Sequence, residues 1–117
     1  VTGVQTCALP ILTAARHTAP ALSGEALRNA IRDAIGRCLD LRTHEAFIFG
    51  SEATGAATPR SDIDIGILGP APLPGSVMQE IREELESLRT LRMFDVVDMN
   101  RVDEAFRNRA IAHAERL

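Results

Sequence analysis

The chain contains no tryptophan, no tyrosine and only four phenylalanines among its 117 residues. Aliphatic side chains must therefore build the core, and aromatic platforms for stacking single-stranded nucleic acid are not expected. The two cysteines, Cys7 and Cys38, are too few for a disulfide framework or a four-ligand zinc site. No apolar run approaches the roughly 18 residues that a membrane-spanning helix needs. These absences argue against disulfide-rich, zinc-ribbon and membrane-spanning classes.

Positive charge is not in excess either. Thirteen Lys and Arg residues stand against sixteen Asp and Glu residues, which gives a net charge of −3. Because proteins that coat nucleic acid normally carry a basic field, direct nucleic-acid binding is not expected. The hydrophobic share of 45% and the charged share of 25% are those of an ordinary globular protein, and the length predicts one domain.

The first eleven residues, 1–11, have neither an initial methionine nor the basic and apolar regions of a signal peptide. They resemble, codon for codon, the translation of one reading frame of a common short-read sequencing adapter. We therefore regard residues 1–11 as a non-native, adapter-derived segment. Residues 12–22 are expected to be a loose lead-in, and residues 23–117 to be a single domain.

Three helices are predicted from apolar residues that recur every three or four positions. The first follows Ser23, the second follows Ser76, which with Gln79 fits a capping box, and the third follows Asn100. The apolar faces consist of Leu27, Ile31, Ile35 and Leu39 in the first helix, Val77, Ile81, Leu85 and Leu88 in the second, and Val102, Phe106, Ala110 and Ala114 in the third.

Three strands are predicted at residues 46–49, 62–68 and 93–97, from short β-prone runs and, in the second, a strict alternation of isoleucines. Residues 51–61 form a connection with room for one helical turn at its start. The order helix, strand, strand, helix, strand, helix predicts an α/β or α+β fold. In it, helices cover a small mixed three-stranded sheet.

Gly50-Ser51 ends the first strand, and Asp62 and Asp64 begin the second. A Gly-Ser turn exposes backbone N–H groups and a hydroxyl, which suit phosphate oxygens. Asp62 and Asp64 are two residues apart, so both carboxylates point to one face of the strand. Convergent carboxylates bind Mg²⁺, which often shares its ligands with substrate phosphates.

The third strand offers Asp95 and Asp98 as a further carboxylate. Phe94 and Val96 share one face and are expected in the core, so Asp95 lies on the opposite face, where a metal ligand can sit. Asp98 has the parity of the core residues but stands at the end of the strand, where we expect it to turn out to water. We therefore favour Asp95.

The arrangement also predicts strand directions. For Gly50 and Asp62 to meet at one site, the first two strands must run antiparallel. The helix between the second and third strands allows a parallel crossover, which brings Asp95 to the same end as Asp62.

Together, Gly50-Ser51, the Asp62-x-Asp64 pair and Asp95 resemble the nucleotidyltransferase superfamily of DNA polymerase beta, and in particular its minimal nucleotidyltransferases. The resemblance covers about residues 22–117. It implies a polymerase-beta-type fold and an enzyme that binds ATP together with two Mg²⁺ ions. Gly50 and Ser51 would hold the β- and γ-phosphates, and Asp62 and Asp64 would bind both metals. Asp95 would bind the catalytic metal and help deprotonate the attacking hydroxyl.

One stretch departs from the family pattern. Many members read Gly-Ser-Arg-Ala-Arg-Gly or Gly-Ser-Phe-Ala-Arg-Gly, whereas this chain has Glu52 and Thr54 within residues 50–55. A basic residue is thus missing and a negative charge is added. Arg60 is the candidate for part of the missing positive charge.

Stand-alone chains of this size resemble the antitoxins that pair with HEPN-domain toxins, which implies a cytoplasmic protein that transfers AMP to a side chain of such a toxin, usually a tyrosine. Two alternatives remain. An aminoglycoside-type nucleotidyltransferase shares the same motifs but normally carries a further helical domain, which does not fit within 117 residues unless the chain is truncated. A catalytically degenerate antitoxin that acts by binding alone is motivated by Glu52 and Thr54.

Overall fold

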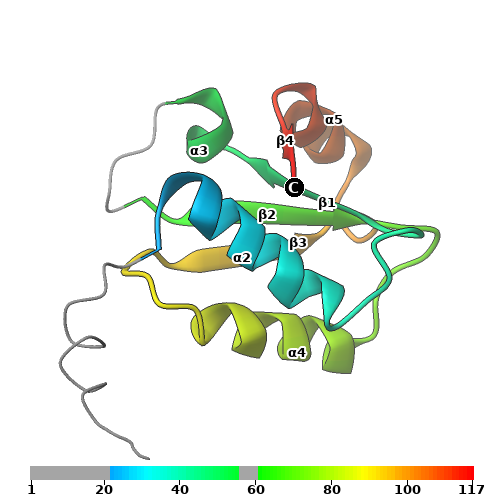
Figure 1. Ribbon diagram of the computed structural model, residues 1–117. Helices are drawn as coiled ribbons and strands as arrows, with labels where there is room; N and C mark the ends of the chain where they lie inside the picture. Colours follow the sequence, from blue (N-terminus) through cyan, green and yellow to red (C-terminus); the bar gives the residue numbers. More distant parts are fainter. Residues whose placement is uncertain (1–21, 56–60) are drawn as a thin grey trace, which may run out of the picture.

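The computed structural model describes residues 22–55 and 61–117. They form a four-stranded mixed sheet with helices against both faces (Figure 1). Predictions for residues 1–11, most of the lead-in, and Arg60 lie outside the described residues. The elements are α2 (Gly24–Gly36), β1 (Glu45–Phe49), α3 (Ser51–Thr54), β2 (Ile63–Leu68), α4 (Gly75–Glu86), β3 (Phe94–Asp98), α5 (Glu104–Ala112) and β4 (Glu115–Arg116).

The strand order is β3-β2-β1-β4. β1 runs antiparallel to β2, and β2 runs parallel to β3, as predicted. α4 forms the crossover between the parallel pair, which needs a connection long enough to return the chain to its starting edge. The ends that carry Gly50, Asp62 and Asp95 therefore meet at one side of the sheet.

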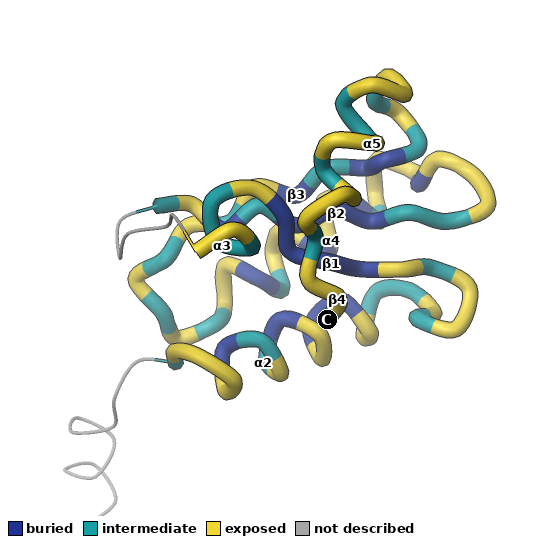
Figure 2. Tube along the Cα trace, turned by 90° about the horizontal axis from the view of Figure 1, so that it is seen from above, coloured by how far each residue is buried: buried dark blue, intermediate teal, exposed yellow. Residues whose placement is uncertain are grey.

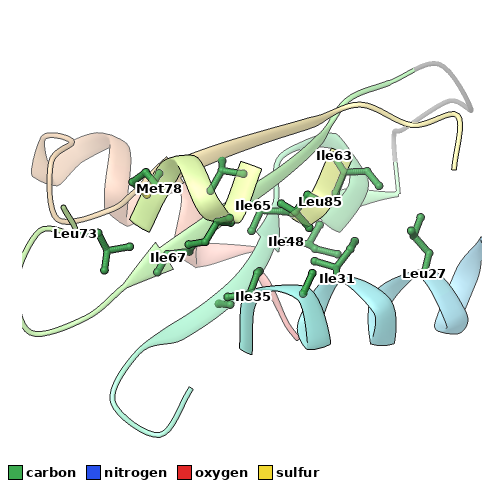
Figure 3. Close-up of a cluster of buried hydrophobic side chains, with 14 residues drawn as sticks. Leu27, Ile31, Ile35, Ile48, Ile63, Ile65, Ile67, Leu73, Met78 and Leu85 are labelled. Atoms are coloured by element: carbon green, nitrogen blue, oxygen red, sulfur yellow. The ribbon is translucent and has the colours of Figure 1, made fainter. Parts of the chain in front are cut away.

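The main core lies between the sheet and the helices α2 and α4. The isoleucines of β2 point to this face, where they meet the apolar stripes of the two helices; Figure 3 shows these side chains interdigitating. Burying each such side chain stabilises the fold by about 1.5–3 kcal/mol. The most deeply buried members are Ile31, Ile35, Ile48, Ile63, Ile65, Ile67, Ile81 and Leu85.

A smaller cluster occupies the other face, beneath α5. It contains Phe47, Phe49 and Met99, with Phe106 of α5 packed against them. Gly66 makes room for it, because a Cβ at Gly66 would lie 2.6 Å from the Phe47 ring. α5 itself has no buried residue, and Figure 2 shows it as a largely exposed helix. The second face is therefore only partly covered.

The helix boundaries correct several local predictions. α2 ends at Gly36, before Leu39, and its N-cap residue Ser23 makes no side-chain capping hydrogen bond. The capping box predicted at Ser76 is wrong: α4 begins at Gly75 after Pro74 at the N-cap, without a side-chain cap. Proline suits this place because its ring holds φ near the value found there, −60°.

The last helix begins later than predicted. Asp103, not Asn100, caps α5, and its carboxylate accepts a hydrogen bond of 2.7 Å from the backbone N–H of Phe106. Asn100 instead bonds to Gly69 through both its amide oxygen and its amide nitrogen, at 3.0 and 2.9 Å. Its side chain therefore joins two loops rather than starting a helix.

The fourth strand was not predicted. α5 ends at Ala112, so Ala114 does not belong to its apolar face. The following residues pair antiparallel with β1, and the N–H of Leu117 donates to the carbonyl of Ala46 at 3.1 Å. Pairing of β4 satisfies backbone groups on the edge of β1 that a three-stranded sheet would leave open. In the described parts of the chain, no helix has the length and apolar character needed to cross a membrane.

Candidate functional site

Three residues stand side by side across the sheet at the end where the candidate site lies. Phe49 of β1 is the register partner of Asp64 in β2, and Asp64 is the partner of Asp95 in β3. Neighbouring strands lie about 4.8 Å apart, so the two carboxylates are close neighbours. The alternation within β2 and β3 turns Asp64 and Asp95 to the face opposite the main core. Asp62 directly precedes β2, which begins at Ile63 and not at residue 62 as predicted, and its charge acts on Asp64. We call Asp62, Asp64 and Asp95 the acidic site.

Gly50 lies directly against the acidic site. Its φ of 72° and ψ of −148° belong to a region that residues with a Cβ rarely adopt. A Cβ at this position would stand 3.3 Å from Cγ of Asp64 and would overlap its carboxylate oxygen. Only glycine fits here. The chain then enters α3 at Ser51, so the predicted helical turn after the Gly-Ser pair is confirmed.

The acidic site is electrostatically strained. Partial burial raises the pKa of the Asp64 carboxyl above its ordinary value, and the nearby charges of Asp95 and Asp62 raise it further. A carboxylate with a raised pKa is one whose negative charge is poorly compensated. Such a group gains from a bound proton or cation.

The donor set suits a hard divalent cation, since carboxylate oxygens are its preferred ligands. Asp64 and Asp95 are adjacent in register, and Gly50, which has no side chain, lets the Asp64 carboxylate approach the end of β1. Within residues 22–55 and 61–117, however, no group of three His, Cys, Asp or Glu side chains already converges on one point. The residues thus fit the metal by chemistry and by placement on the strands, and their side chains would have to turn toward it.

Asp98 does not turn out to water, so that prediction is wrong. The residue is 6% exposed, and its side chain accepts hydrogen bonds from the backbone N–H groups of Leu73 at 2.8 Å and Asn100 at 2.9 Å. Arg101 lies 3.4 Å from the same carboxylate. The loop that follows β2 supplies the donor from Leu73, which draws Asp98 inward. Asp98 therefore holds loops together, away from the acidic site.

Glu52 has a partner that the sequence did not reveal. Arg92, in the loop before β3, donates a hydrogen bond of 2.6 Å to the Glu52 carboxylate and another of 2.8 Å to the carbonyl of Ser61. Both charged side chains are less than a quarter exposed. The negative charge that Glu52 adds beside Ser51 is therefore neutralised within the protein.

A cavity of about 230 Å³ lies beside Gly50, between β1, α3 and α5. Phe49 and Phe106 give it an apolar wall, and Thr54, Arg109 and His113 add polar groups. Arg109 is exposed on α5, and the sequence analysis did not single it out as a site residue. Its place beside Gly50 depends on how α5 packs, which no local pattern indicates.

The family model described as "Polymerase beta, Nucleotidyltransferase" matches residues 41–117, which include all four strands and the acidic site. The chain belongs to this family. The predicted polymerase-beta-type fold is thereby confirmed, with four strands in place of three. A comparison with curated proteins gave no match.

Solved structures share the fold of this member of the family. A chain from a crystal structure of a toxin–antitoxin with AMP-PNP superposes with a TM-score of 0.64 at 22% identity, over 75% of this chain and 69% of that one. A structure of a tri-AMPylated Shewanella oneidensis HEPN toxin in complex with an MNT antitoxin gives 0.59 at 19% identity, over 77% and 67%. The toxin–antitoxin MntA–HepT gives 0.53 at 18%, over 80% and 70%. At these identities the likeness shows a common fold.

Proposed function

We propose that this nucleotidyltransferase is an Mg²⁺-dependent enzyme that transfers AMP from ATP to a hydroxyl group of a partner protein. The observation that carries the proposal is the juxtaposition of Gly50, Asp64 and Asp95: a glycine whose backbone lies directly against one carboxylate, and a second carboxylate next to that one in register. Membership of the family supports the reaction type. The raised pKa of Asp64 supports a cation as the missing partner of the acidic site.

Each residue has a role in this proposal. Asp62 and Asp64 would hold two Mg²⁺ ions, and Asp95 would hold one of them as a further ligand. Gly50 and Ser51 bind the β- and γ-phosphates through backbone N–H groups and the hydroxyl. The bound metal supplies charge neutralisation for the phosphates and the leaving pyrophosphate.

The transfer balances as a displacement at phosphorus. The acceptor oxygen forms a bond to the α-phosphorus, and the bond from that phosphorus to the bridging oxygen of the β-phosphate breaks. Pyrophosphate leaves with the electron pair. The proton of the acceptor hydroxyl passes to the Asp95 carboxylate, which the β3 alternation turns to the same face as Asp64.

The proposed acceptor is a HEPN-domain toxin, and the chain acts as its antitoxin. The support is the shared fold with the antitoxin complexes, one of which contains an AMPylated HEPN toxin. This chain has no tyrosine, so a labelled tyrosine must belong to the partner. Arg60, the proposed additional phosphate contact, stays a proposal based on the sequence.

The decisive experiment is a transfer assay with ATP labelled at the α-phosphate, Mg²⁺ and a HEPN toxin encoded beside the gene. We expect label on the toxin with the wild-type chain and none with Asp64→Asn or Asp95→Asn. Asp33→Asn is the matched control, because Asp33 is exposed on α2, on the other face of the sheet. Label on this chain alone would contradict the proposal.

The same assay separates the alternatives. A chain that acts by binding alone would neutralise the toxin equally well as wild type and as Asp64→Asn, with no label transferred. The added charge of Glu52 favours that alternative, and its pairing with Arg92 weakens it. Label on an added aminoglycoside in place of the toxin would identify the small-molecule alternative.

A further inference from the structure

The cavity beside Gly50 lies on the face of the sheet that carries the acidic site. Phe49 lines the cavity and is also the register partner of Asp64. The cavity and the Asp64 carboxylate therefore lie on neighbouring strands. Gly50 lines it too, and the same glycine touches Asp64. A ligand that passes over Gly50 can therefore reach both the acidic site and the cavity.

The two sides of Gly50 have opposite charge. Asp62, Asp64 and Asp95 stand on one side, and Arg109 stands on the other, at the cavity. Among the described residues, the Arg109 guanidinium has no hydrogen-bond or ion-pair partner. Other arginines nearby are engaged: Arg92 pairs with Glu52, and Arg107 donates to the carbonyl of Val102. Arg109 is thus available to a ligand.

The packing of α5 keeps Arg109 at this place. The rings of Phe49 and Phe106 meet edge to face with centroids 6.1 Å apart, and Ala110 packs on the same cluster. Asp103 fixes the start of the helix through its bond to the N–H of Phe106. Arg109 lies one turn beyond Phe106, so its helical position is set by a ring that also lines the cavity.

The loop next to Gly50 has no cation of its own in its described part, since Ser51–Gly55 contains Glu52 and no basic residue. A guanidinium has a planar set of donors that matches phosphate oxygens, and it keeps its charge at any ordinary pH. We propose that Arg109 supplies the positive charge for the terminal phosphates of the nucleotide, in place of a basic residue in the loop. This inference rests on the proposed function and adds a phosphate-binding residue from α5 to it.

The test measures binding by calorimetry with three probes: ATP, inorganic tripolyphosphate and AMP, each with Mg²⁺ and with EDTA. The variants are Arg109→Gln, which removes the charge, and Arg109→Lys, which keeps it. Arg82→Gln is the matched control, because Arg82 is exposed on α4, behind the opposite face of the sheet, and has no side-chain partner in the described part of the chain. Thermal unfolding of each variant checks that the fold is retained.

We expect Arg109→Gln to weaken ATP and tripolyphosphate binding by about tenfold or more, the size expected when a hydrogen bond to a charged group is lost. Binding of AMP, which has no terminal phosphates, should change little, and Arg109→Lys should retain part of the affinity. The weaker polyphosphate binding of Arg109→Gln should persist in EDTA, whereas weaker binding by Asp64→Asn should appear only with Mg²⁺.

The experiment distinguishes failure of the Arg109 assignment from failure of the proposed function. If Arg109→Gln binds both polyphosphates like the wild type while Asp64→Asn does not, the role of Arg109 is overturned and the proposed function stands. If the wild type binds neither ATP nor tripolyphosphate in the presence of Mg²⁺, both are overturned. An equal loss in Arg82→Gln would show a general charge effect and would also overturn the assignment to Arg109.

Discussion

The carboxylate of Asp64 occupies the space in which any side chain at Gly50 would lie. The contact joins the end of β1 to the start of β2, because Asp64 is paired across from Phe49, the residue before Gly50. Conformation and contact both demand glycine at position 50.

We expect Gly50→Ala to lower the free energy of unfolding by about 1–3 kcal/mol, the cost of holding a non-glycine residue in such a backbone conformation. The new Cβ should also displace Asp64 and weaken Mg²⁺ binding. Gly55→Ala is the control, since Gly55 has a φ of 80° and, among the described residues, no neighbour within 4 Å of a Cβ. It should destabilise the protein without affecting Mg²⁺. Chemical denaturation and a metal titration measure both effects, and loss of Mg²⁺ binding in Gly55→Ala would argue against a specific contact.

The raised pKa of Asp64 predicts how stability depends on pH. The folded protein holds the Asp64 proton more tightly than the unfolded chain does, so the stability of the wild type falls as pH rises from the unfolded pKa through the folded one. Asp64→Asn removes this loss. The variant should therefore be more stable than the wild type at neutral pH, and the difference should shrink as the pH is lowered and Asp64 becomes protonated.

At neutral pH, Mg²⁺ should reduce the difference in stability between Asp64→Asn and the wild type, because the ion binds the folded wild type and compensates the charge of its carboxylates. Thermal unfolding across pH, with and without Mg²⁺, checks this, with Asp33→Asn as the control for removing an exposed charge. A variant less stable than the wild type at neutral pH without metal would contradict the electrostatic argument.

Asp95 and Asp98 should respond in opposite ways to the same substitution. Asp98→Asn removes one acceptor oxygen from a buried group and should lower the free energy of unfolding by about 1–3 kcal/mol. Asp95→Asn should not lower stability, because Asp95 is exposed and its charge repels that of Asp64, and it should reduce AMP transfer by about 10²–10⁴-fold. Denaturation and the transfer assay, applied to both variants, decide the matter. An inactive but stable Asp98→Asn would reverse the assignment.

The Glu52–Arg92 pair should show energetic coupling. In a double-mutant cycle of Glu52→Gln and Arg92→Met, we expect an interaction energy of about 0.5–3 kcal/mol. Arg92→Met should cost more than Glu52→Gln, since Arg92 also donates to the carbonyl of Ser61. Urea denaturation of the four proteins measures the cycle. Strict additivity would mean that the pair contributes nothing, as many exposed ion pairs do.

The alternation of Ile63, Ile65 and Ile67 made the sheet predictable, because period-two burial determines the face on which Asp62 and Asp64 lie. The antiparallel direction of β1 and β2 followed from the requirement that Gly50 and Asp62 meet at one site, and the parallel direction of β2 and β3 from the helix between them. The parity argument for Asp95 also agrees with its place opposite Asp64.

Other features depend on contacts between distant residues and left no local pattern. β4 has two residues, too few for a period, and exists because the edge of β1 offers partners. Asp98 is drawn inward by the N–H of Leu73, which is 25 residues away. Arg92 finds Glu52 at a separation of 40 residues. Apolar periodicity placed Ala114, just before β4, in the last helix, and the position of Asp98 at a strand end led us to expect it in water.

The alternation along β2 also protects the sheet against mispairing. If β2 slipped by one residue against β1, Asp62 and Asp64 would enter the main core and the isoleucines would face α5. Burying two unpaired carboxylates among aliphatic side chains is strongly unfavourable, so misaligned sheets are disfavoured during folding. The carboxylates proposed to bind metal thus also disfavour the incorrect strand register. Replacing both with apolar residues would remove the penalty that separates the native register from its nearest competitor.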